Sequence, residues 1–377
     1  MSDPSKQSDI GVNEGTFDRL AAQRRQHPKR VARIGVIGVG WWATTNHLPI
    51  LKARRDVALA SVCGLDEQVL HRVRDDFGIE HTTTDYRDLL EQNLDGVIIA
   101  TPHPLHAEHA IAAIEAGCHV MVEKPMTTTI KQARKMLNDA TEKNRIVVVS
   151  YGWHHRPLCV KAKQLMERGL IGEVEHVVCH MGSPGKNLFS GVSFDYADSA
   201  YVVPDLGTYA DPKKAQGGYG QGQLSHAAGL LFWLTGLRAG RVFAFTNNAG
   251  CQLDMYDAIT VQFTNGATGI VGGAATVPGG ARFQLDFRIF GSEGMLNLDI
   301  DRERLDVYRH DGEAVIVDLE RDEGAYGCDG PPHEFVELIL GLTEQNSSPV
   351  EIGLRAVELI DSAYRSARTS QPVEVFA

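Results

Sequence analysis

The sequence lacks several features that define large classes of protein. No apolar stretch approaches the roughly 18 residues of a membrane span. A block of clustered Lys and Arg, which a nucleic-acid backbone requires, is also absent from a chain with 37 basic and 48 acidic side chains and a formal charge of −11. We therefore expect neither a membrane nor a nucleic acid as partner. A small anionic ligand at one local site stays compatible with this charge.

Cysteine is present but follows no motif. The six cysteines are far apart and form no C-x-x-C pair, which disfavours a disulfide framework and favours a reducing compartment. The first 30 residues are polar and lack the apolar segment of a signal peptide, and Arg24-Arg25 is not followed by the apolar residues of a twin-arginine signal. We expect a cytoplasmic protein with a polar N-terminal arm over residues 1–30 that includes a short helix over Thr16–Arg25.

The composition that remains is that of a globular protein, with 43 % apolar and 23 % charged residues. A length of 377 residues favours two domains, because single cores stop growing near about 250–300 residues. From Arg33, short runs rich in β-branched residues alternate with helical patterns. The expected strands are Ile34–Ile37, Val57–Cys63, Val97–Ala100, Val120–Val122 and Ile146–Val149. The expected helices are Pro49–Arg54, Glu67–Phe77, His106–Ala116 and Ile130–Lys143. This alternation predicts an α/β fold with a doubly wound parallel sheet of the Rossmann type over residues 31–150.

The pattern changes after Ser150. A stretch rich in Gly, Asp and Tyr, residues 182–222, has no clear period, and loops of that length are usually functional. The expected strands then follow one another, near Val174–Cys179, Arg241–Phe245, Ala258–Phe263, Gly269–Ala275, Phe283–Gly291 and Gly294–Ile300. The expected helices are Lys161–Arg168, Leu224–Leu234, His333–Leu342 and Gly353–Ser366. Turns such as Thr264-Asn265-Gly266 favour a mostly antiparallel sheet in an α/β domain over residues 151–377.

The first chemical motif is a glycine turn after the strand that ends at Ile37. The residues Gly38-Val39-Gly40-Trp41-Trp42-Ala43 fit G-x-G-x-x-A. In such a motif Gly38 allows the tight turn, Gly40 lets the backbone approach a pyrophosphate, and Ala43 permits close packing of helix and strand. The turn therefore predicts a bound dinucleotide, although a purely structural glycine turn is the alternative.

The residue at the tip of the second strand usually distinguishes an NAD site from an NADP site. The usual acidic residue that binds the adenosine ribose would stand at Gly64, and Asp66 lies two residues later. Asp66 is either this ribose ligand or the N-cap of the next helix. Gly64 removes a carboxylate that would repel a 2′-phosphate, and Arg72 or Arg74 is available to meet one. Either NAD or NADP remains compatible with the sequence.

Several further motifs resemble one protein family. They are Thr101-Pro102-His103-Pro104-Leu105-His106, Ala113–Val120, Glu123-Lys124-Pro125, Arg156-Pro157, Gly169–Glu173 and Ala363-Tyr364-Arg365-Ser366. Matched in this order from about Arg33 to the end, they resemble the Gfo/Idh/MocA family, named after glucose–fructose oxidoreductase and inositol dehydrogenase. The resemblance implies a nicotinamide-binding Rossmann domain followed by a C-terminal α/β domain. The large open sheet of that second domain is expected to carry substrate contacts and the contacts of a homo-oligomer, a dimer or a tetramer.

Lys124 matches the lysine of the E-K-P motif in that family. At the C-terminal end of a strand, such a lysine can hydrogen-bond a substrate hydroxyl while hydride leaves its carbon. Desolvation and a nearby nicotinamide cation would lower its pKa and help the proton transfer. The alternative is an exposed lysine at the end of a strand, paired with Glu123.

His226 matches the histidine of the family motif D-x-G-x-H, but its surroundings depart from the pattern. Gly222 replaces the aspartate and Leu224 replaces the glycine. Without the carboxylate, the imidazole loses a partner that would raise its pKa and fix its tautomer. Gln223 or a tyrosine could orient the ring instead. We expect an acid/base or substrate-contact role for His226, with a backbone-satisfied helix residue as the alternative.

The resemblance also implies which residues line the site. Expected around the cofactor are Gly38, Gly40, Trp41, Trp42, Ala43, Asp66, Thr101, Pro102, His106, Glu123, Lys124 and Arg156. Expected around the substrate are Lys124, Trp153, His154, Tyr209, Gln223 and His226, with Tyr196, Tyr201 and Asp205 as further sugar contacts. His103, His106 and His109 recur every three residues, but neighbouring prolines break the helix and no further ligand is spaced to complete a set, so we expect no metal.

These features predict an NAD(P)-dependent oxidoreductase that transfers hydride between a nicotinamide cofactor and a hydroxyl-bearing carbon of a sugar, glycoside or cyclitol. One alternative is a redox-neutral enzyme that keeps NAD tightly bound and cleaves a glycoside or eliminates from it. The altered residue at Gly222 motivates this alternative. Another is a non-catalytic sensor of a sugar or NAD. No nucleophile elbow and no P-loop is present.

Overall fold

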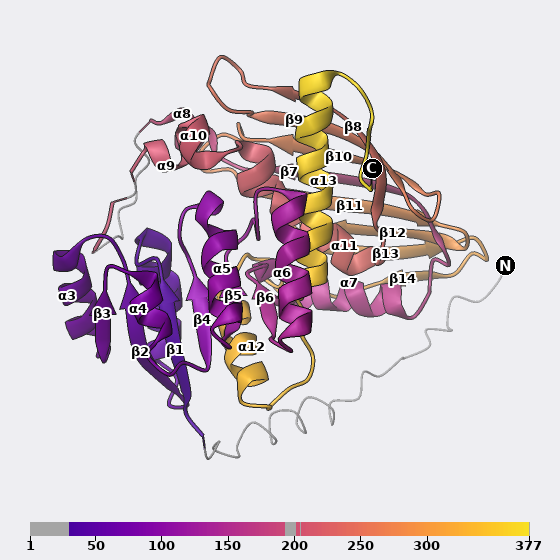
Figure 1. Ribbon diagram of the computed structural model, residues 1–377. Helices are drawn as coiled ribbons and strands as arrows, with labels where there is room; N and C mark the ends of the chain where they lie inside the picture. The colour runs from indigo at the N-terminus through magenta and orange to yellow at the C-terminus, as the bar shows by residue number, and fades with distance from the viewer. Residues whose placement is uncertain (1–29, 193–200, 204, 377) are drawn as a thin grey trace.

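The computed structural model describes residues 30–192, 201–203 and 205–376, and it contains two β-sheets (Figure 1). The predicted helix over Thr16–Arg25 and the predicted sugar contact Tyr196 lie outside these residues. One sheet, formed early in the chain, has helices around it. The other is a broad sheet with the long helix α13 (Val350–Thr369) running across it.

The first sheet has six parallel strands in the order β3-β2-β1-β4-β5-β6, which confirms the doubly wound topology. Its strands are β1 (Ala32–Ile37), β2 (Val57–Cys63), β3 (His81–Thr83), β4 (Gly96–Ile99), β5 (His119–Val122) and β6 (Val147–Val149). The short polar strand β3 was not predicted, because its three residues carry no apolar run. The order reverses between β1 and β4, and ligands of such sheets bind beyond the carboxyl ends of the strands at that point.

Helices join the parallel strands, as the alternation predicts. They are α2 (Leu48–Lys52), α3 (Glu67–Phe77), α4 (Tyr86–Leu90), α5 (His106–Glu115) and α6 (Ile130–Glu142). A further helix, α12 (Gly330–Ile339), comes from late in the chain and packs on the same sheet. A Cβ on Gly96 of β4 would lie 2.6 Å from Ile339 and 2.7 Å from Phe335, so helix and strand are in close contact. Residues beyond 300 thus contribute to the core of the first sheet.

The second sheet has nine strands in the order β14-β13-β12-β11-β7-β10-β9-β8-β15. They are β7 (Val174–Gly182), β8 (Ala239–Asn247), β9 (Tyr256–Phe263), β10 (Thr268–Ala274), β11 (Gln284–Gly291), β12 (Gly294–Asp299), β13 (Arg304–Arg309), β14 (Ala314–Ile316) and β15 (Val373–Glu374). Only β7 and β10 pair in parallel, which confirms the mostly antiparallel sheet. The edge strands β14 and β15, and β13 next to β14, were not predicted.

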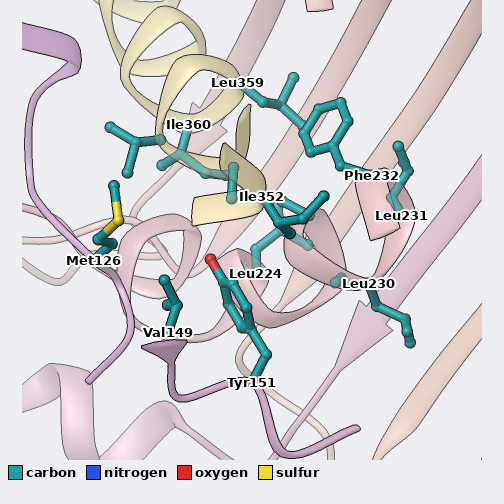
Figure 2. Packing of buried hydrophobic residues seen from close by; sticks show 14 of the residues in the cluster. Met126, Val149, Tyr151, Leu224, Leu230, Leu231, Phe232, Ile352, Leu359 and Ile360 are labelled. Carbon is teal, nitrogen blue, oxygen red and sulfur yellow. The ribbon is translucent and has the colours of Figure 1, made fainter. Parts of the chain in front are cut away.

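Two helices cover one face of this second sheet and meet the end of β6 there. They are α11 (Ser225–Thr235), which is buried around most of its circumference, and α13. Figure 2 shows Phe232 of α11 packing near Leu359 of α13. A Cβ on Gly229 of α11 would lie 2.7 Å from the ring of Tyr151, so that helix approaches the residue after β6 closely. This packing fixes the position of α11 and of the residues that precede it.

The aperiodic stretch after β7 forms a series of short turns. It contains α8 (Lys186–Ser190), α9 (Gly207–Ala210), α10 (Pro212–Ala215) and the five-residue π-type turn η4 (Gly220–Leu224) directly before α11. A similar π-type turn, η1 (Ala43–His47), follows the glycine motif and continues into α2. In the second sheet's half of the chain, α7 (Pro157–Glu167) lies beside α11.

Candidate active site

A cavity of about 590 Å³ lies where the carboxyl ends of β1, β4 and β5 meet the turn η4 and helix α11. Of the residues predicted for the cofactor, those lining it are Gly40, Trp41, Trp42, Thr101, Pro102, His106, Glu123 and Lys124. Of those predicted for the substrate, Trp153, Tyr209, Gln223 and His226 line it together with Lys124. Asp205 also lines it, with its carboxylate paired to Lys214. The structure thus brings most of the two predicted sets into one space.

The glycine turn has the geometry that its motif predicts. Gly38 has φ +97°, and a Cβ there would lie 2.6 Å from the carbonyl of Ala100, so a side chain is sterically excluded. A Cβ on Gly40 would meet nothing within 4 Å. The Thr44 hydroxyl donates to the Gly40 carbonyl at 3.0 Å and closes the turn. The chain is thus tightly packed at Gly38 and has free space beside Gly40. This combination fits the pyrophosphate of a dinucleotide.

The end of the second strand favours the capping alternative for Asp66. Its Oδ1 atom accepts hydrogen bonds from the backbone amides of Gln68 at 2.8 Å and Val69 at 3.1 Å, the pattern of an N-cap. At the usual acidic position, a Cβ on Gly64 would lie 2.4 Å from Val39. Asp66 therefore lies outside the cavity and is already engaged at the start of α3.

A buried carboxylate organises the strand-end side of the cavity. Glu123 Oε1 accepts hydrogen bonds from Trp42 Nε1 and lies 2.9 Å from His47 Nε2, and its other oxygen faces the Lys124 amide at 3.3 Å. Burial alone would raise the pKa of Glu123. The hydrogen bond and charge of His47, together with the charge of Lys124, outweigh it and leave the pKa below its usual value. Glu123 is therefore an ionised anchor between the glycine turn and β5.

Lys124 reaches across the cavity from this network. Its Nζ donates to the carbonyl of Gly222 in η4 at 2.9 Å. Burial lowers the pKa of this amine, and the charge of Glu123 offsets part of that effect. The bond between Lys124 and Pro125 is cis. A partly buried lysine with a lowered pKa and one fixed acceptor is suited to take up a proton from a substrate hydroxyl.

His226 faces the same cavity but has no charged partner. It is 6 % exposed, and its ring lies edge-on to Trp153 at 5.3 Å and to Tyr326 at 5.5 Å. Burial first, then the charges of Lys124 and His154, lower its pKa well below the usual value. Its Nδ1 atom is buried and has no hydrogen-bond partner among the residues that the structure describes. The imidazole is therefore neutral at physiological pH.

An aromatic ring fills the place of the missing carboxylate. A Cβ on Gly222 would lie 3.0 Å from the ring carbons Cε1 and Cζ of Phe189 in α8. Phe189 is 2 % exposed and lines the cavity. The position at which the family motif has aspartate therefore has neither the charge nor the space for one without movement of Phe189.

Some predicted residues do not line the cavity. The ring of His154 stacks on Trp233 at 4.7 Å and its Nδ1 lies 2.9 Å from the carbonyl of Ser347, while burial lowers its pKa to about 3. Arg156 lies 3.9 Å from Asp329 and is likewise outside the cavity lining. The structure places both residues behind the site. Gly38 and Ala43 support the glycine turn from beneath rather than facing the cavity.

The sequence reasoning missed several residues of the site. Phe189, Tyr326 and Phe283 form part of the cavity wall, and His47 binds Glu123. Phe189 and Tyr326 come from stretches without a predicted element, and Phe283 stands at the start of a predicted strand that gave no sign of a role in the site. Only the position of His47, four residues after the glycine motif, was a possible signal. His103 also lines the cavity, where burial and the nearby His106 and Lys124 lower its pKa.

The histidine triplet is engaged in other contacts. His106 lies between the carbonyls of Pro125 at 2.8 Å and Thr101 at 2.7 Å, and His109 Nδ1 lies 3.1 Å from the Thr101 hydroxyl. Within residues 30–192, 201–203 and 205–376, no group of three or more His, Cys, Asp or Glu side chains could hold a metal ion.

Across the same residues, no helix has the length and apolar character to cross a membrane.

Comparison with protein families gives two matches, one over the first sheet and one over most of the second. The model described as "Oxidoreductase family, NAD-binding Rossmann fold" matches residues 32–151, and the "GFO/IDH/MocA C-terminal domain" matches residues 159–297. These matches confirm the resemblance drawn from the motifs.

Relatives that this chain resembles include sugar dehydrogenases. A levoglucosan dehydrogenase of Pseudarthrobacter phenanthrenivorans is 27 % identical over 293 residues, which is 71 % of this chain and 74 % of that protein. A D-xylose 1-dehydrogenase [NADP(+)] of Haloarcula marismortui is 30 % identical over 45 % of this chain and 48 % of its own length. A D-glucoside 3-dehydrogenase of Escherichia coli is 32 % identical over 42 % and 46 %. The chain spans about half the length of the latter two.

Solved structures share the whole fold. A levoglucosan dehydrogenase in complex with NADH and levoglucosan superposes with a TM-score of 0.73 at 22 % identity, covering 92 % of this chain and 100 % of that one. An oxidoreductase domain protein from Kribbella flavida gives 0.75 at 23 % identity, covering 92 % and 99 %. At these identities the likeness shows that the two-sheet architecture is common to all three chains.

Proposed function

Because the chain belongs to the GFO/IDH/MocA family of NAD-binding oxidoreductases, we propose that it transfers hydride between NAD or NADP and a hydroxyl-bearing carbon of a sugar, glycoside or cyclitol. One observation carries the proposal. Lys124 Nζ, with its pKa lowered by burial, shares a single cavity with the open glycine turn and with His226. Cofactor-binding surface and a proton acceptor therefore face the same space.

The residues that would hold the dinucleotide are those of the glycine turn and the ends of β4 and β5. Backbone amides after Gly40 would bind the pyrophosphate. Thr101, Pro102 and His106 line the cavity beyond the end of β4, and Trp42 is fixed there by its bond to Glu123. A nicotinamide bound in this space supplies the hydride acceptor or donor.

Proton transfer is the task of Lys124. As the substrate carbon loses hydride, its hydroxyl becomes a carbonyl and the hydroxyl proton must leave. The neutral amine of Lys124 accepts that proton, and in the reverse direction the ammonium returns it. One N–H of Lys124 stays bound to the Gly222 carbonyl, so the remaining positions on Nζ are directed away from that oxygen. His226, neutral, contributes a hydrogen bond to a substrate hydroxyl rather than a charge.

The walls of the cavity support a ring-shaped polyol as substrate. Trp153, Phe189 and Tyr326 present aromatic surface, which suits the C–H faces of a sugar ring, while Gln223 and Tyr209 supply polar contacts. The named relatives act on levoglucosan, D-xylose and D-glucosides. We extend the class, rather than any one of these sugars, to this chain.

The open face of the second sheet supports assembly with a second copy. Side chains on it remain exposed although they are large and apolar. They include Phe245, Tyr256, Ile270, Tyr308 and Ile316. A patch of this kind is typical of an interface. We propose a homo-oligomer, dimer or tetramer, formed through this face. Light scattering of the native protein and of Ile270→Lys tests this proposal, since a monomeric native protein contradicts it.

The six unpaired cysteines support a cytoplasmic location.

The experiment for the activity is a substrate screen. Levoglucosan, D-xylose, a methyl glucoside and an inositol are each incubated with NAD⁺ and with NADP⁺ while the absorbance of reduced nicotinamide is followed. We expect one of these polyols to reduce a cofactor. Consumption of a glycoside without net reduction of the cofactor would favour the redox-neutral alternative. Tight sugar binding without turnover in either cofactor would favour the sensor.

A further inference from the structure

The turn η4 is held by a buried carboxylate on the side opposite the cavity. Asp254, just before β9, accepts a hydrogen bond from the Gly218 amide on Oδ1 at 2.9 Å and one from the Gly220 amide on Oδ2 at 2.8 Å. Its own carbonyl accepts from the amide of Tyr219 at 3.0 Å. Three consecutive residues at the start of η4 are therefore bound to one aspartate.

A phenol from a distant helix completes this arrangement. The hydroxyl of Tyr364 in α13 donates to Asp254 Oδ2 at 3.1 Å and accepts from the amides of Gln221 at 2.9 Å and Gly218 at 3.2 Å. Tyr364 belongs to the Ala-Tyr-Arg-Ser motif, for which the proposed reaction provides no use. The contacts give it a function: it joins α13 to the turn that carries Gly222.

A second carboxyl group lies against the first. Asp257 in β9 is 6 % exposed and forms a side-chain hydrogen bond with Asp254. Its Oδ2 atom is buried without a hydrogen-bond partner in the described part of the chain. A hydrogen bond between two carboxyl groups requires a proton on one of them. Burial and the neighbouring Asp254 carboxyl raise the pKa of Asp257 well above its usual value.

Several glycines are needed for the carboxyl groups and the Tyr364 hydroxyl to approach the turn this closely. A Cβ on Gly218 would lie 2.4 Å from the backbone of Asp254, and one on Gly220 would lie 2.9 Å from the Tyr364 hydroxyl. A Cβ on Gly273 of β10 would lie 3.0 Å from Asp257 Oδ2. The glycines at the start of η4 therefore leave room for Asp254 and for the Tyr364 hydroxyl.

We propose that Asp254 and Tyr364 are positioning residues for the reaction: they hold η4 by its backbone amides so that the Gly222 carbonyl meets Lys124 Nζ. The consequence for catalysis rests on the proposed role of Lys124. The arrangement of the turn does not rest on it, so the two are tested by different measurements.

The first measurement is hydrogen exchange of the peptide that covers residues 216–224, in the full-length protein. Asp254→Asn and Tyr364→Phe each remove hydrogen bonds to these amides, so we expect their exchange to accelerate about tenfold or more. Asp257→Asn keeps a neutral donor toward Asp254, and we expect exchange close to that of the unmodified protein. Tyr86→Phe, which removes a tyrosine hydroxyl that donates to Glu108 rather than to this turn, is the matched control.

Two outcomes would overturn the assignment. One is unchanged exchange of this peptide in both Asp254→Asn and Tyr364→Phe. The other is Asp257→Asn accelerating it as much as Asp254→Asn, which would show that Asp254 has no special part in holding the turn. If either variant fails to fold, the folded one of the two still decides, and circular dichroism identifies which.

The second measurement is the split between kcat and KM with the alcohol that passes the substrate screen. Misplacement of the Gly222 carbonyl affects proton transfer, so we expect Tyr364→Phe to lower kcat about tenfold while KM for the cofactor changes by less than twofold. A merely structural role would change neither at a temperature where the variant is fully folded. Unchanged kcat together with accelerated exchange would retain the turn assignment and remove its catalytic consequence.

Discussion

The two sides of the cavity are built differently. On the strand-end side, Glu123 is ionised and binds Trp42, His47 and the backbone of Lys124. On the helix side, His226 lies among aromatic rings, and Phe189 fills the space beside Gly222. Charged groups therefore lie around Lys124, whereas aromatic side chains lie around His226. The difference favours Lys124 over His226 as the acid–base group of the proposed reaction, with His226 as a neutral contact.

The largest effect is expected at the lysine. Lys124→Met removes the proton acceptor, so we expect kcat to fall by about 10²–10⁴-fold, the usual contribution of general acid–base catalysis. Binding of the reduced cofactor, followed by its fluorescence, should persist. Lys135→Met, at an exposed position on α6, is the control.

The same assay on the other side of the cavity sharpens the contrast. His226→Asn keeps a neutral hydrogen-bonding group, so we expect kcat to fall by less than about tenfold, as for one neutral hydrogen bond. Equal losses in the lysine and histidine variants would mean that the two sides share the proton transfer.

An effect between those of the lysine and histidine variants is expected from the carboxylate beside the lysine. Glu123→Gln removes the charge that keeps the pKa of Lys124 from falling further. We expect a loss in kcat of about 10- to 100-fold from the broken charged hydrogen bonds. The rise of the oxidation rate with pH should also move to lower pH, because a smaller pKa leaves the amine neutral sooner. Glu115→Gln, exposed on α5, serves as the comparison; a shift to higher pH would contradict the account.

A carboxylate introduced at position 222 would remove the difference in charge between the two sides of the cavity. Gly222→Asp places a side chain against Phe189, and overpacking of this kind costs about 1–3 kcal/mol, so we expect about a tenfold loss of activity. Combined with Phe189→Ala, the aspartate has room, and its charge should raise the pKa of His226 toward the range of about pH 5–8. A histidine ionisation that appears in the pH profile of the double variant only is the expected signature; its presence in the unmodified protein would refute a neutral His226.

The smallest effect concerns stability. Burial lowers the pKa of His154 to about 3, below that of a histidine in the unfolded chain. The stabilisation by this neutral form is complete above about pH 6.5 and is lost as the pH falls, by about 2 kcal/mol at pH 5. The melting temperature should therefore decrease on acidification, and less so in His154→Asn than in the exposed control His71→Asn. Equal decreases would show that other groups carry the effect.

The sequence allowed the prediction of what is local and repeated. The β-branched runs of β1, β2, β4, β5 and β6 predicted the parallel sheet, because strand burial on both faces leaves apolar runs. The glycine motif predicted its turn from local spacing, whereas Lys124 in Glu123-Lys124-Pro125 was singled out by the resemblance to the family. The edge strands β14 and β15 are short and mostly exposed, and so carry no such pattern.

The remainder of the site depends on contacts between distant parts of the chain. Asp254 and Tyr364 are 110 positions apart, and His47 and Glu123 are 76 apart, so no motif joins either pair. Phe189 and Tyr326 line the cavity from aperiodic loops. Asp66, by contrast, was uncertain for a local reason: cap and ribose ligand occupy neighbouring positions, and the hydrogen bonds to Gln68 and Val69 favour the cap.

The pH dependence of kcat/KM for alcohol oxidation, compared between the unmodified protein and Lys124→Met, tests the central claim most directly. With the polyol that passes the screen, we predict one ionisation on the acidic side, below the ordinary lysine value of about 10.4, that disappears in the variant. The same ionisation persisting in Lys124→Met would show that another group accepts the proton, and would contradict the assignment of Lys124 as the base.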